Sequence, residues 1–166
     1  MQDASELKMV SPKEESNVKS ATDIAIRLAT RDDIQGISDC IEPFVLEGKV
    51  LPRTLGELEE LIGNYVVAES DGAIVGCAVL EIYSRKLAEV RSLVVMPEYQ
   101  RFGLGKRLVD ACLEKAKAEE ILEVMAITSR TSFFQSCGFD YTLPGEKVAL
   151  FYVASPHLLV KKSSAD

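Results

Sequence analysis

The stretch YQRFGLGKRLVDACLEKA, which begins at Tyr99, combines features that can bind a phosphate. Gly103 and Gly105 lie where an amphipathic helix should begin, and Arg101 and Lys106 add positive charge beside them. The first N–H groups of a helix have no partner within it and carry partial positive charge, so a phosphate binds there if the backbone is accessible. We therefore expect a diphosphate site at this turn. The alternative is a tight strand-to-helix turn that needs glycine for steric reasons alone.

The elements that must position this turn follow from the spacing of apolar and turn residues. Apolar runs bounded by turn residues predict strands. Thr30 and Thr54, each followed three residues later by an acid, predict helix starts, and Pro43 is expected to end the first of these helices. Asp71-Gly72 predicts a hairpin turn. The expected strands are 24–28, 65–69, 73–83, 87–95, 122–128 and 148–153, and the expected later helices are 103–118 and 131–137.

This order of elements predicts an α/β fold around one mixed sheet. The N-terminal strands follow one another as hairpins and should be antiparallel, whereas the strands on either side of the 103–118 helix should be parallel. Helices are expected on both faces of the sheet. The expected domain is 24–160, between a disordered tail at 1–23 and a flexible tail at 161–166.

The composition excludes several classes of function. The chain has 166 residues, a net charge of −7 and 47% hydrophobic residues, which suits one domain with its own core. Nucleic-acid and membrane-surface binding favour clustered positive charge, so we expect neither partner. One histidine and four cysteines without CxxC spacing argue against a metal site. The absence of a signal-peptide core or a membrane-spanning run points to a cytoplasmic protein.

The context of the glycine turn carries a family resemblance. The string L-x-V-x-P-x-Y-Q-x-x-G-x-G, from Leu93 to Gly105, resembles motif A of the GCN5-related N-acetyltransferases (GNAT), and FFQSCGF, at 133–139, resembles motif B. The resemblance implies the GNAT fold, with a splayed pair of parallel strands, and acetyl-CoA as cosubstrate without a metal. The implied acetyl-CoA contacts are the backbone of Leu93, Val94 and Val95 for the pantetheine and thioester, and the amides of Arg101, Phe102, Gly103, Leu104, Gly105 and Lys106 for the diphosphate.

Three further stretches are similar to the acetyltransferase domain of N-acetylglutamate synthases. They are GKVLPRTLGELEELI (48–62), IVGCAVL (74–80) and AEVRSLVV (88–95). The resemblance implies a short, stand-alone form that transfers acetyl to the α-amino group of L-glutamate, the opening step of arginine biosynthesis. No cysteine stands where it would form an acetyl-enzyme, so direct attack in a ternary complex is expected. The partner would be a small-molecule amino acid, and a homodimer is left open.

The acceptor chemistry points to an acid and several arginines. An attacking amine must be neutral, and a nearby carboxylate can take its proton. Glu89 lies on the expected thioester strand, where strict alternation would place Glu89, Arg91 and Leu93 on one face; the alternative is an exposed glutamate paired with Arg91 or Lys86. The resemblance makes Glu89 the base and Arg53 a carboxylate ligand. Bidentate geometry suits arginine to this role, and the further candidates for the second carboxylate are Arg91 and Arg130.

Two departures from the family pattern leave parts of the site open. The motif B tyrosine that protonates the departing thiolate in many relatives is replaced by Phe134, so Thr128 and Ser129 are the candidates for the acid. No arginine follows the last expected strand in FYVASPHLLVKK, so glutamine, another small amine or a protein N-terminus stays open as acceptor. A non-catalytic acetyl-CoA-binding module is the remaining alternative.

Overall fold

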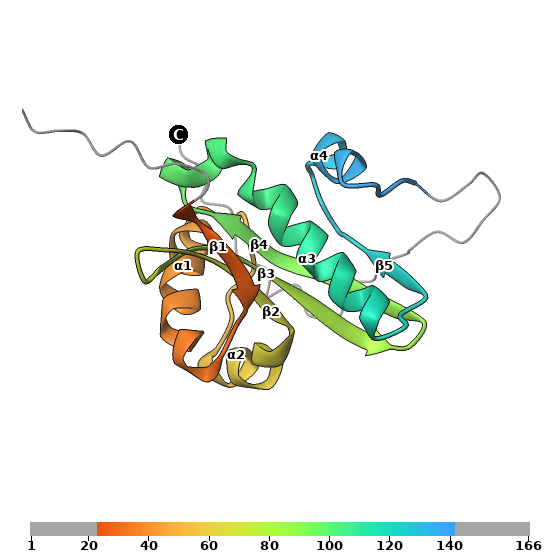
Figure 1. Cartoon of the computed structure of the whole chain (residues 1–166), viewed down its shortest axis with the longest axis horizontal. Helices are drawn as coiled ribbons and strands as arrows, with labels where there is room; N and C mark the ends of the chain where they lie inside the picture. The colour runs from red at the N-terminus through yellow and green to blue at the C-terminus, as the bar shows by residue number, and fades with distance from the viewer. Residues whose placement is uncertain (1–22, 142–166) are drawn as a thin grey trace, which may run out of the picture.

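The computed structural model describes residues 23–141, which form a layered α/β domain around one sheet (Figure 1). The sheet has five strands in the order β1-β2-β3-β4-β5. The strands are β1 (Ala25–Leu28), β2 (Tyr65–Ser70), β3 (Ala73–Ser84), β4 (Leu87–Val95) and β5 (Glu123–Met125). The helices are η2 (Arg31–Asp33), α1 (Ile34–Leu46), α2 (Leu55–Leu61), η3 (Ile62–Asn64), η4 (Pro97–Phe102), α3 (Leu104–Ala118) and α4 (Thr131–Ser136).

The sheet is mixed, as the order of elements predicts. β1, β2, β3 and β4 pair antiparallel with their neighbours in turn, and β5 pairs parallel with β4 after the α3 crossover. The turn between β2 and β3 has positive φ at both Asp71 (52°) and Gly72 (78°), the geometry that the predicted hairpin requires. The α/β fold class is therefore confirmed for the described residues.

Two hydrophobic layers lie on opposite faces of the sheet. On one face α3 buries Leu104, Leu108 and Cys112 against strand residues that include Ala78 and Val90. On the other face Ile37 of α1 and Leu58 of α2 are buried in one cluster with strand residues that include Val67 and Val79. Figure 1 shows α3 crossing the sheet on one side, and α1 and α2 grouped on the other. The four cysteines are free and buried in these layers.

Capping residues define the helix starts, but Pro43 does not end the first helix. Thr30 with Asp33, and Thr54 with Glu57, form the two predicted capping boxes. α1 instead continues through Pro43 to Leu46. Proline removes one helical N–H, yet the turn that follows buries Phe44, and the N–H of Glu47 donates to the Pro43 carbonyl at 3.1 Å. Tertiary packing therefore outweighs the loss of one hydrogen bond.

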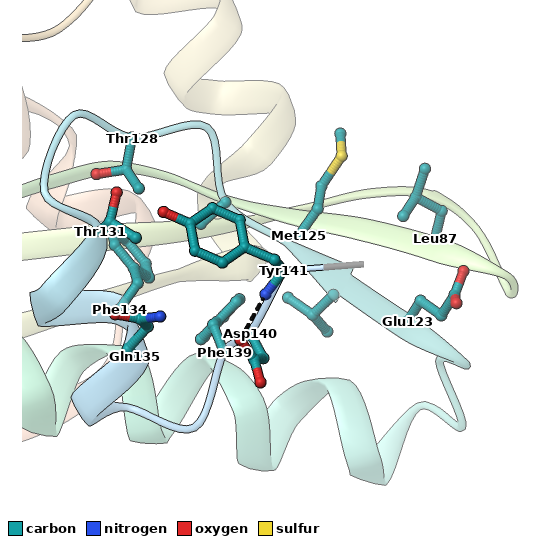
Figure 2. A pocket seen from close by; sticks show the side chains of 12 residues that line it. Leu87, Glu123, Met125, Thr128, Thr131, Phe134, Gln135, Phe139, Asp140 and Tyr141 are labelled. Atoms are coloured by element: carbon teal, nitrogen blue, oxygen red, sulfur yellow. Dashed lines mark hydrogen bonds between the residues drawn. The ribbon is translucent and has the colours of Figure 1, made fainter. Parts of the chain in front are cut away.

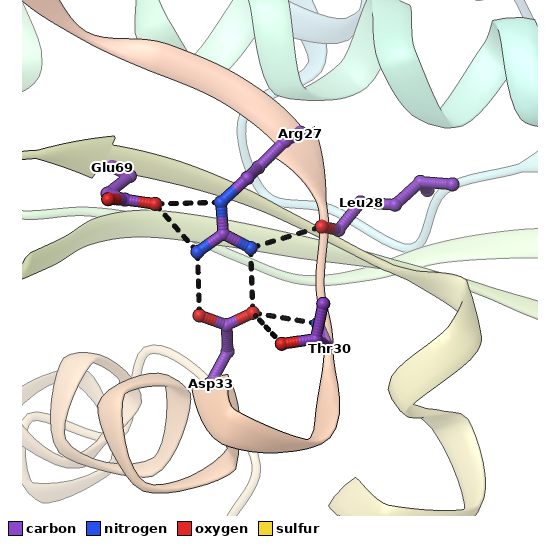
Figure 3. Close-up of polar contacts among 5 residues, drawn as sticks. All are labelled: Arg27, Leu28, Thr30, Asp33 and Glu69. Atoms are coloured by element: carbon purple, nitrogen blue, oxygen red, sulfur yellow. Dashed lines mark hydrogen bonds and ion pairs between the residues drawn. The ribbon is translucent and has the colours of Figure 1, made fainter. Parts of the chain in front are cut away.

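Arg27 joins three elements at the start of the domain (Figure 3). Its guanidinium donates to both carboxylate oxygens of Asp33 at 2.7 Å, and its Nε donates to Glu69 on β2 at 2.7 Å. The Arg27 guanidinium, followed by the N–H and hydroxyl of Thr30, lowers the pKa of Asp33 to about 2. This network fixes β1 and η2, the turn that leads into α1, against β2.

The later part of the chain differs in extent from the prediction. β5 is shorter than the expected 122–128, because only Glu123 to Met125 pair with β4. α4 ends before Gly138, whose φ of 92° confirms the predicted left-handed turn. The expected strand 148–153, the two tails and the end of the 24–160 domain lie outside the described residues. None of the described helices is long and apolar enough to cross a membrane.

Candidate active site

A β-bulge in β4 shapes the centre of the sheet. Arg91 pairs with Val79, but Val94 pairs with Cys77, so Ser92 and Leu93 together face one residue of β3. Ser92 has a φ of 49°, which non-glycine residues rarely adopt. The bulge turns Leu93 toward the α3 face, where it packs on the core. Strict alternation, which would place Leu93 on the face of Glu89 and Arg91 in a strand without a bulge, therefore ends at Ser92.

The same strand has an open edge beyond Glu89. β5 pairs only with Leu87 to Glu89 of β4, so within residues 23–141 the continuation of that edge, from Val90 to Val95, has no strand partner. Leu93, Val94 and Val95 lie along this edge, where the Val95 carbonyl already accepts a hydrogen bond from the Gln100 side chain. Unpaired backbone amides and carbonyls at a sheet edge can hydrogen-bond an extended, peptide-like molecule.

The two glycines of the turn have different structural roles. Gly103 adopts a left-handed conformation, with φ of 68°, and no atom outside its immediate neighbours lies within 4 Å of an added Cβ. An added Cβ at Gly105 would lie 3.3 Å from the ring of Phe133 on α4. The steric alternative thus holds for both glycines. It does not compete with anion binding, since the surface at Gly103 stays open.

The first turn of α3 presents unshared amides beside this open surface. The N–H of Arg107 donates to the Gly103 carbonyl at 3.2 Å, and the preceding amides of the turn have no helical acceptor in an α-helix. Gln100 ties η4, which precedes the turn, to the end of β4, because its side-chain amide donates to the Val95 carbonyl at 3.0 Å. Arg101 is exposed, and Lys106 pairs with Asp110 at 3.2 Å. The turn is therefore tied to the end of β4 and carries cations at its rim.

Glu89 is buried on the α1 face, two residues before Arg91. It is 6% exposed, and its Oε2 accepts a hydrogen bond from the Tyr83 hydroxyl at 2.5 Å. Its other oxygen lies 3.8 Å from Nε of Arg91. Burial, and then the hydrogen bond to Glu89, raises the pKa of Tyr83 to about 12, so Tyr83 is a neutral donor at physiological pH. Glu89 is thus a buried acid that also makes the Arg91 contact of the alternative hypothesis.

Arg53 and Arg91 meet at one carboxylate oxygen. Oε2 of Glu81 accepts from Arg91 at 2.8 Å and from Arg53 at 3.1 Å. The Arg53 side chain is only 8% exposed, and a guanidinium at that depth requires an anion beside it. Burial opposes the charge of Arg91, but Glu81 and Glu89 more than offset that effect and raise the pKa of Arg91. We name Arg53, Glu81, Glu89, Arg91 and Tyr83 the β3–β4 polar cluster.

The other predicted site residues lie in the loop between β5 and α4. Thr128, Ser129 and Arg130 are exposed, and the Thr128 hydroxyl accepts a hydrogen bond from the Arg130 N–H at 2.9 Å. Thr128 lines a pocket of about 560 Å³ whose lining residues include no member of the polar cluster. Figure 2 shows Thr128 and Thr131 at the α4 end of this pocket, and Leu87 and Glu123 at the opposite end.

A smaller hollow of about 280 Å³ lies beside Arg53. Its walls come mainly from α1 and include Asp39 and Glu42. These acids would repel a carboxylate, so this hollow is a poor place for an acidic amino acid. The hollow shares Arg53 with the polar cluster, but its other charged lining residues are these two acids.

Sequence reasoning missed Glu81, Tyr83 and Tyr65. Glu81 and Tyr83 follow Val79 at intervals of two on β3, so the period of the strand places them on the face that carries Glu89 and Arg91. Tyr65 pairs with Val79 from β2 and is fully buried, and its hydroxyl has no hydrogen-bond partner among the described residues. Burial raises its pKa to about 12. The pairing register, which the sequence does not give, was the missing signal.

Comparison with known proteins identifies the family of this fold and site. Residues 62–141 match the acetyltransferase (GNAT) domain. An uncharacterized N-acetyltransferase of Chlorobaculum tepidum is 34% identical over 119 residues, which cover 72% of this chain and 77% of that protein. The chain belongs to the GNAT family and is an acetyltransferase.

More specific relatives carry a named activity. The amino-acid acetyltransferase of Ralstonia nicotianae is 38% identical over 139 residues, which are 80% of this chain but only 31% of that protein. The solved structure of N-acetylglutamate synthase from Neisseria gonorrhoeae, complexed with coenzyme A and N-acetyl-glutamate, aligns with a TM-score of 0.62 at 31% identity. That alignment covers 68% of this chain and 27% of the synthase.

Proposed function

We propose that the protein transfers acetyl from acetyl-CoA to the α-amino group of an amino acid, with L-glutamate as the leading acceptor. The observation that carries the proposal is the buried Glu89, beside the guanidinium of Arg91, on the bulged strand whose far edge is open. The names of the amino-acid acetyltransferase and of the synthase structure support it. A role in arginine biosynthesis and a cytoplasmic location belong to the same proposal.

Acetyl-CoA would lie along the open edge and the glycine turn. The amides of residues 101–106, which span the end of η4 and the first turn of α3, would bind the diphosphate at the open surface beside Gly103. The backbone of Leu93, Val94 and Val95 would bind the pantetheine arm and the thioester carbonyl. This path brings the thioester to the strand that carries Glu89.

The acceptor would lie on the α1 face of the same strand. The guanidinium groups of Arg53 and Arg91 would bind its α-carboxylate, and Glu89 would take a proton from its ammonium. The freed amine then attacks the thioester carbon, so a C–N bond forms and the C–S bond breaks. The coenzyme A thiolate leaves with the electron pair and takes up a proton, for which Thr128 and Ser129 remain the proposed donors.

A panel of amines tests this proposal. The protein is incubated with acetyl-CoA and, in separate reactions, with glutamate, glutamine, aspartate, spermidine and a short peptide with a free N-terminus, and thiol release is followed. Release with α-amino acids, and N-acetyl-glutamate as the product from glutamate, is the expected result. Release only with spermidine or the peptide would contradict the proposal, and acetyl-CoA binding without release would favour the non-catalytic alternative.

A further inference from the structure

Glu81 lies between Arg53 and Arg91, the two arginines proposed to bind the carboxylate of the acceptor. One oxygen of its carboxylate contacts both guanidinium groups, so Arg53 and Arg91 form one joined site and not two separate ones. The sequence assigned these arginines to different carboxylates of the acceptor. The structure brings them to the same carboxylate of the protein itself.

The charges of the cluster limit what it can accept. Arg53 pairs with Glu81, and Arg91 lies within 4 Å of both Glu81 and Glu89. Glu57 at the first turn of α2 adds a negative charge that acts on both arginines, and its pKa is lowered first by the Thr54 N–H. Glu57 is exposed, so water screens its charge. Among the partly buried groups, the two arginines less the charge of Glu81 leave one positive charge, which matches one carboxylate of an acceptor.

The remaining acid matches the other end of an amino acid. Glu89 faces Arg91 from the same strand and provides one negative charge for one ammonium. An α-amino acid with an uncharged side chain therefore balances the cluster. A second carboxylate would add negative charge to a partly buried site that already contains two acids, where such charges are poorly screened.

We infer that Glu81 determines specificity, and that it reduces the preference of the site for dicarboxylic over monocarboxylic amino acids. The inference rests on the proposed function, since it concerns the acceptor of the same site. Glu81 therefore sets the discrimination between glutamate and glutamine. Because Glu81 is charged in the wild-type enzyme, we expect kcat/KM for glutamate to exceed kcat/KM for glutamine by no more than about threefold.

The test compares Glu81→Gln with the wild type. Glutamine keeps a side-chain oxygen for the arginines and removes the charge, so we expect the ratio of kcat/KM for glutamate to kcat/KM for glutamine to rise about tenfold. Glu69→Gln is the matched control, because Glu69 also pairs with an arginine but lies on β2, away from the cluster. Glu81→Asp keeps the charge at this position. Glu69→Gln and Glu81→Asp should therefore retain the wild-type ratio of the two kcat/KM values.

A binding measurement separates this inference from the proposed function. Calorimetric titration of the coenzyme A complex with N-acetyl-glutamate and N-acetyl-glutamine should give the same tenfold shift in relative affinity for Glu81→Gln. A shifted affinity ratio without turnover of either amino acid supports the inference and contradicts the proposed function. Turnover with a ratio unchanged within twofold overturns the inference alone, and binding of neither product overturns both.

If Glu81→Gln does not fold, the preference of the wild-type enzyme for glutamate over glutamine still tests the inference. A wild-type preference of more than about threefold for glutamate over glutamine would overturn the inference, because the cluster would then favour a second carboxylate despite Glu81. A preference near unity, within about threefold, would support it.

Discussion

Glu89 is the residue on which the proposed chemistry depends most directly. Glu89→Gln keeps an oxygen that accepts from Tyr83 but cannot take a proton from the ammonium of the acceptor. We expect kcat at neutral pH to fall about 100-fold or more, with a small change in the KM for acetyl-CoA. Steady-state kinetics measure this. A kcat within twofold of wild type would remove Glu89 as the base.

Tyr83 is a positioning residue, because it acts on Glu89 through a hydrogen bond of 2.5 Å. Tyr83→Phe removes that bond and keeps the ring. We expect kcat to fall by roughly three- to tenfold, since one hydrogen bond to a charged group contributes about 1.5–3 kcal/mol when it is fully lost and less when water replaces it.

The split between kinetic constants identifies the role of Tyr83. A positioning role predicts a lower kcat, with the KM for acetyl-CoA and the melting temperature nearly unchanged. The melting temperature should change little because the Tyr83 side chain is half exposed and contributes little to the hydrophobic core. A fall in melting temperature with unchanged kcat would instead assign Tyr83 to the fold. Tyr141→Phe, at an exposed tyrosine outside the polar cluster, is the control.

At the scale of elements, the glycine turn must serve both the fold and the cosubstrate. Gly103→Val forces a β-branched residue into φ of 68° and covers the open surface at the turn. We expect a lower melting temperature and an acetyl-CoA affinity reduced at least tenfold. Gly103→Asn is the comparison, because asparagine tolerates this conformation; it should recover most of the melting temperature but not the affinity.

The two readouts are thermal denaturation and calorimetric titration with acetyl-CoA. If Gly103→Val lowers only the melting temperature and binds acetyl-CoA like the wild type, the turn is purely structural. The diphosphate would then have to bind elsewhere.

Elements were predictable where local signals agree with packing. The capping boxes at Thr30 and Thr54 and the Asp71-Gly72 hairpin need no distant contacts, and they were predicted correctly. Pro43 was misread because the burial of Phe44 is a tertiary effect. The family resemblance implies a bulge in this strand, but the residues of β4 alone do not place it at Ser92, since a β-bulge appears only in the pairing with β3.

The site was predictable as separate residues but not as a cluster. Glu89, Arg53 and the glycine turn stand out by type and motif. Glu81 and Tyr83 do not, because each becomes notable only when the register places it opposite Glu89 or Arg91. Thr128, Ser129 and Arg130 stay predictions, since the loop that carries them borders a different pocket.

At the scale of the whole molecule, the Arg27 network makes stability depend on pH. The pKa of Asp33 is about 2 in the folded protein and near its ordinary value of 3.8 when unfolded. The stabilisation is therefore complete above about pH 5 and is lost as the pH falls toward 2. The difference corresponds to about 2 kcal/mol at neutral pH.

Asp33→Asn tests this dependence by chemical denaturation between pH 7 and pH 2. The variant should be less stable than the wild type by about 2 kcal/mol at pH 7, and the gap should narrow steadily as the pH approaches 2. A gap that stays constant over this range would show that the carboxylate charge of Asp33 is not the source of its contribution.

In the proposed complex the cosubstrate and the acceptor lie on opposite sides of one strand, β4. A crystal structure of the protein with coenzyme A and N-acetyl-glutamate tests this most directly. We predict the diphosphate on the amides of residues 101–106, the pantetheine arm along Leu93 to Val95, and the α-carboxylate of the product on Arg53 and Arg91. A nucleotide bound away from the glycine turn, or a product bound away from Glu89, would contradict the account.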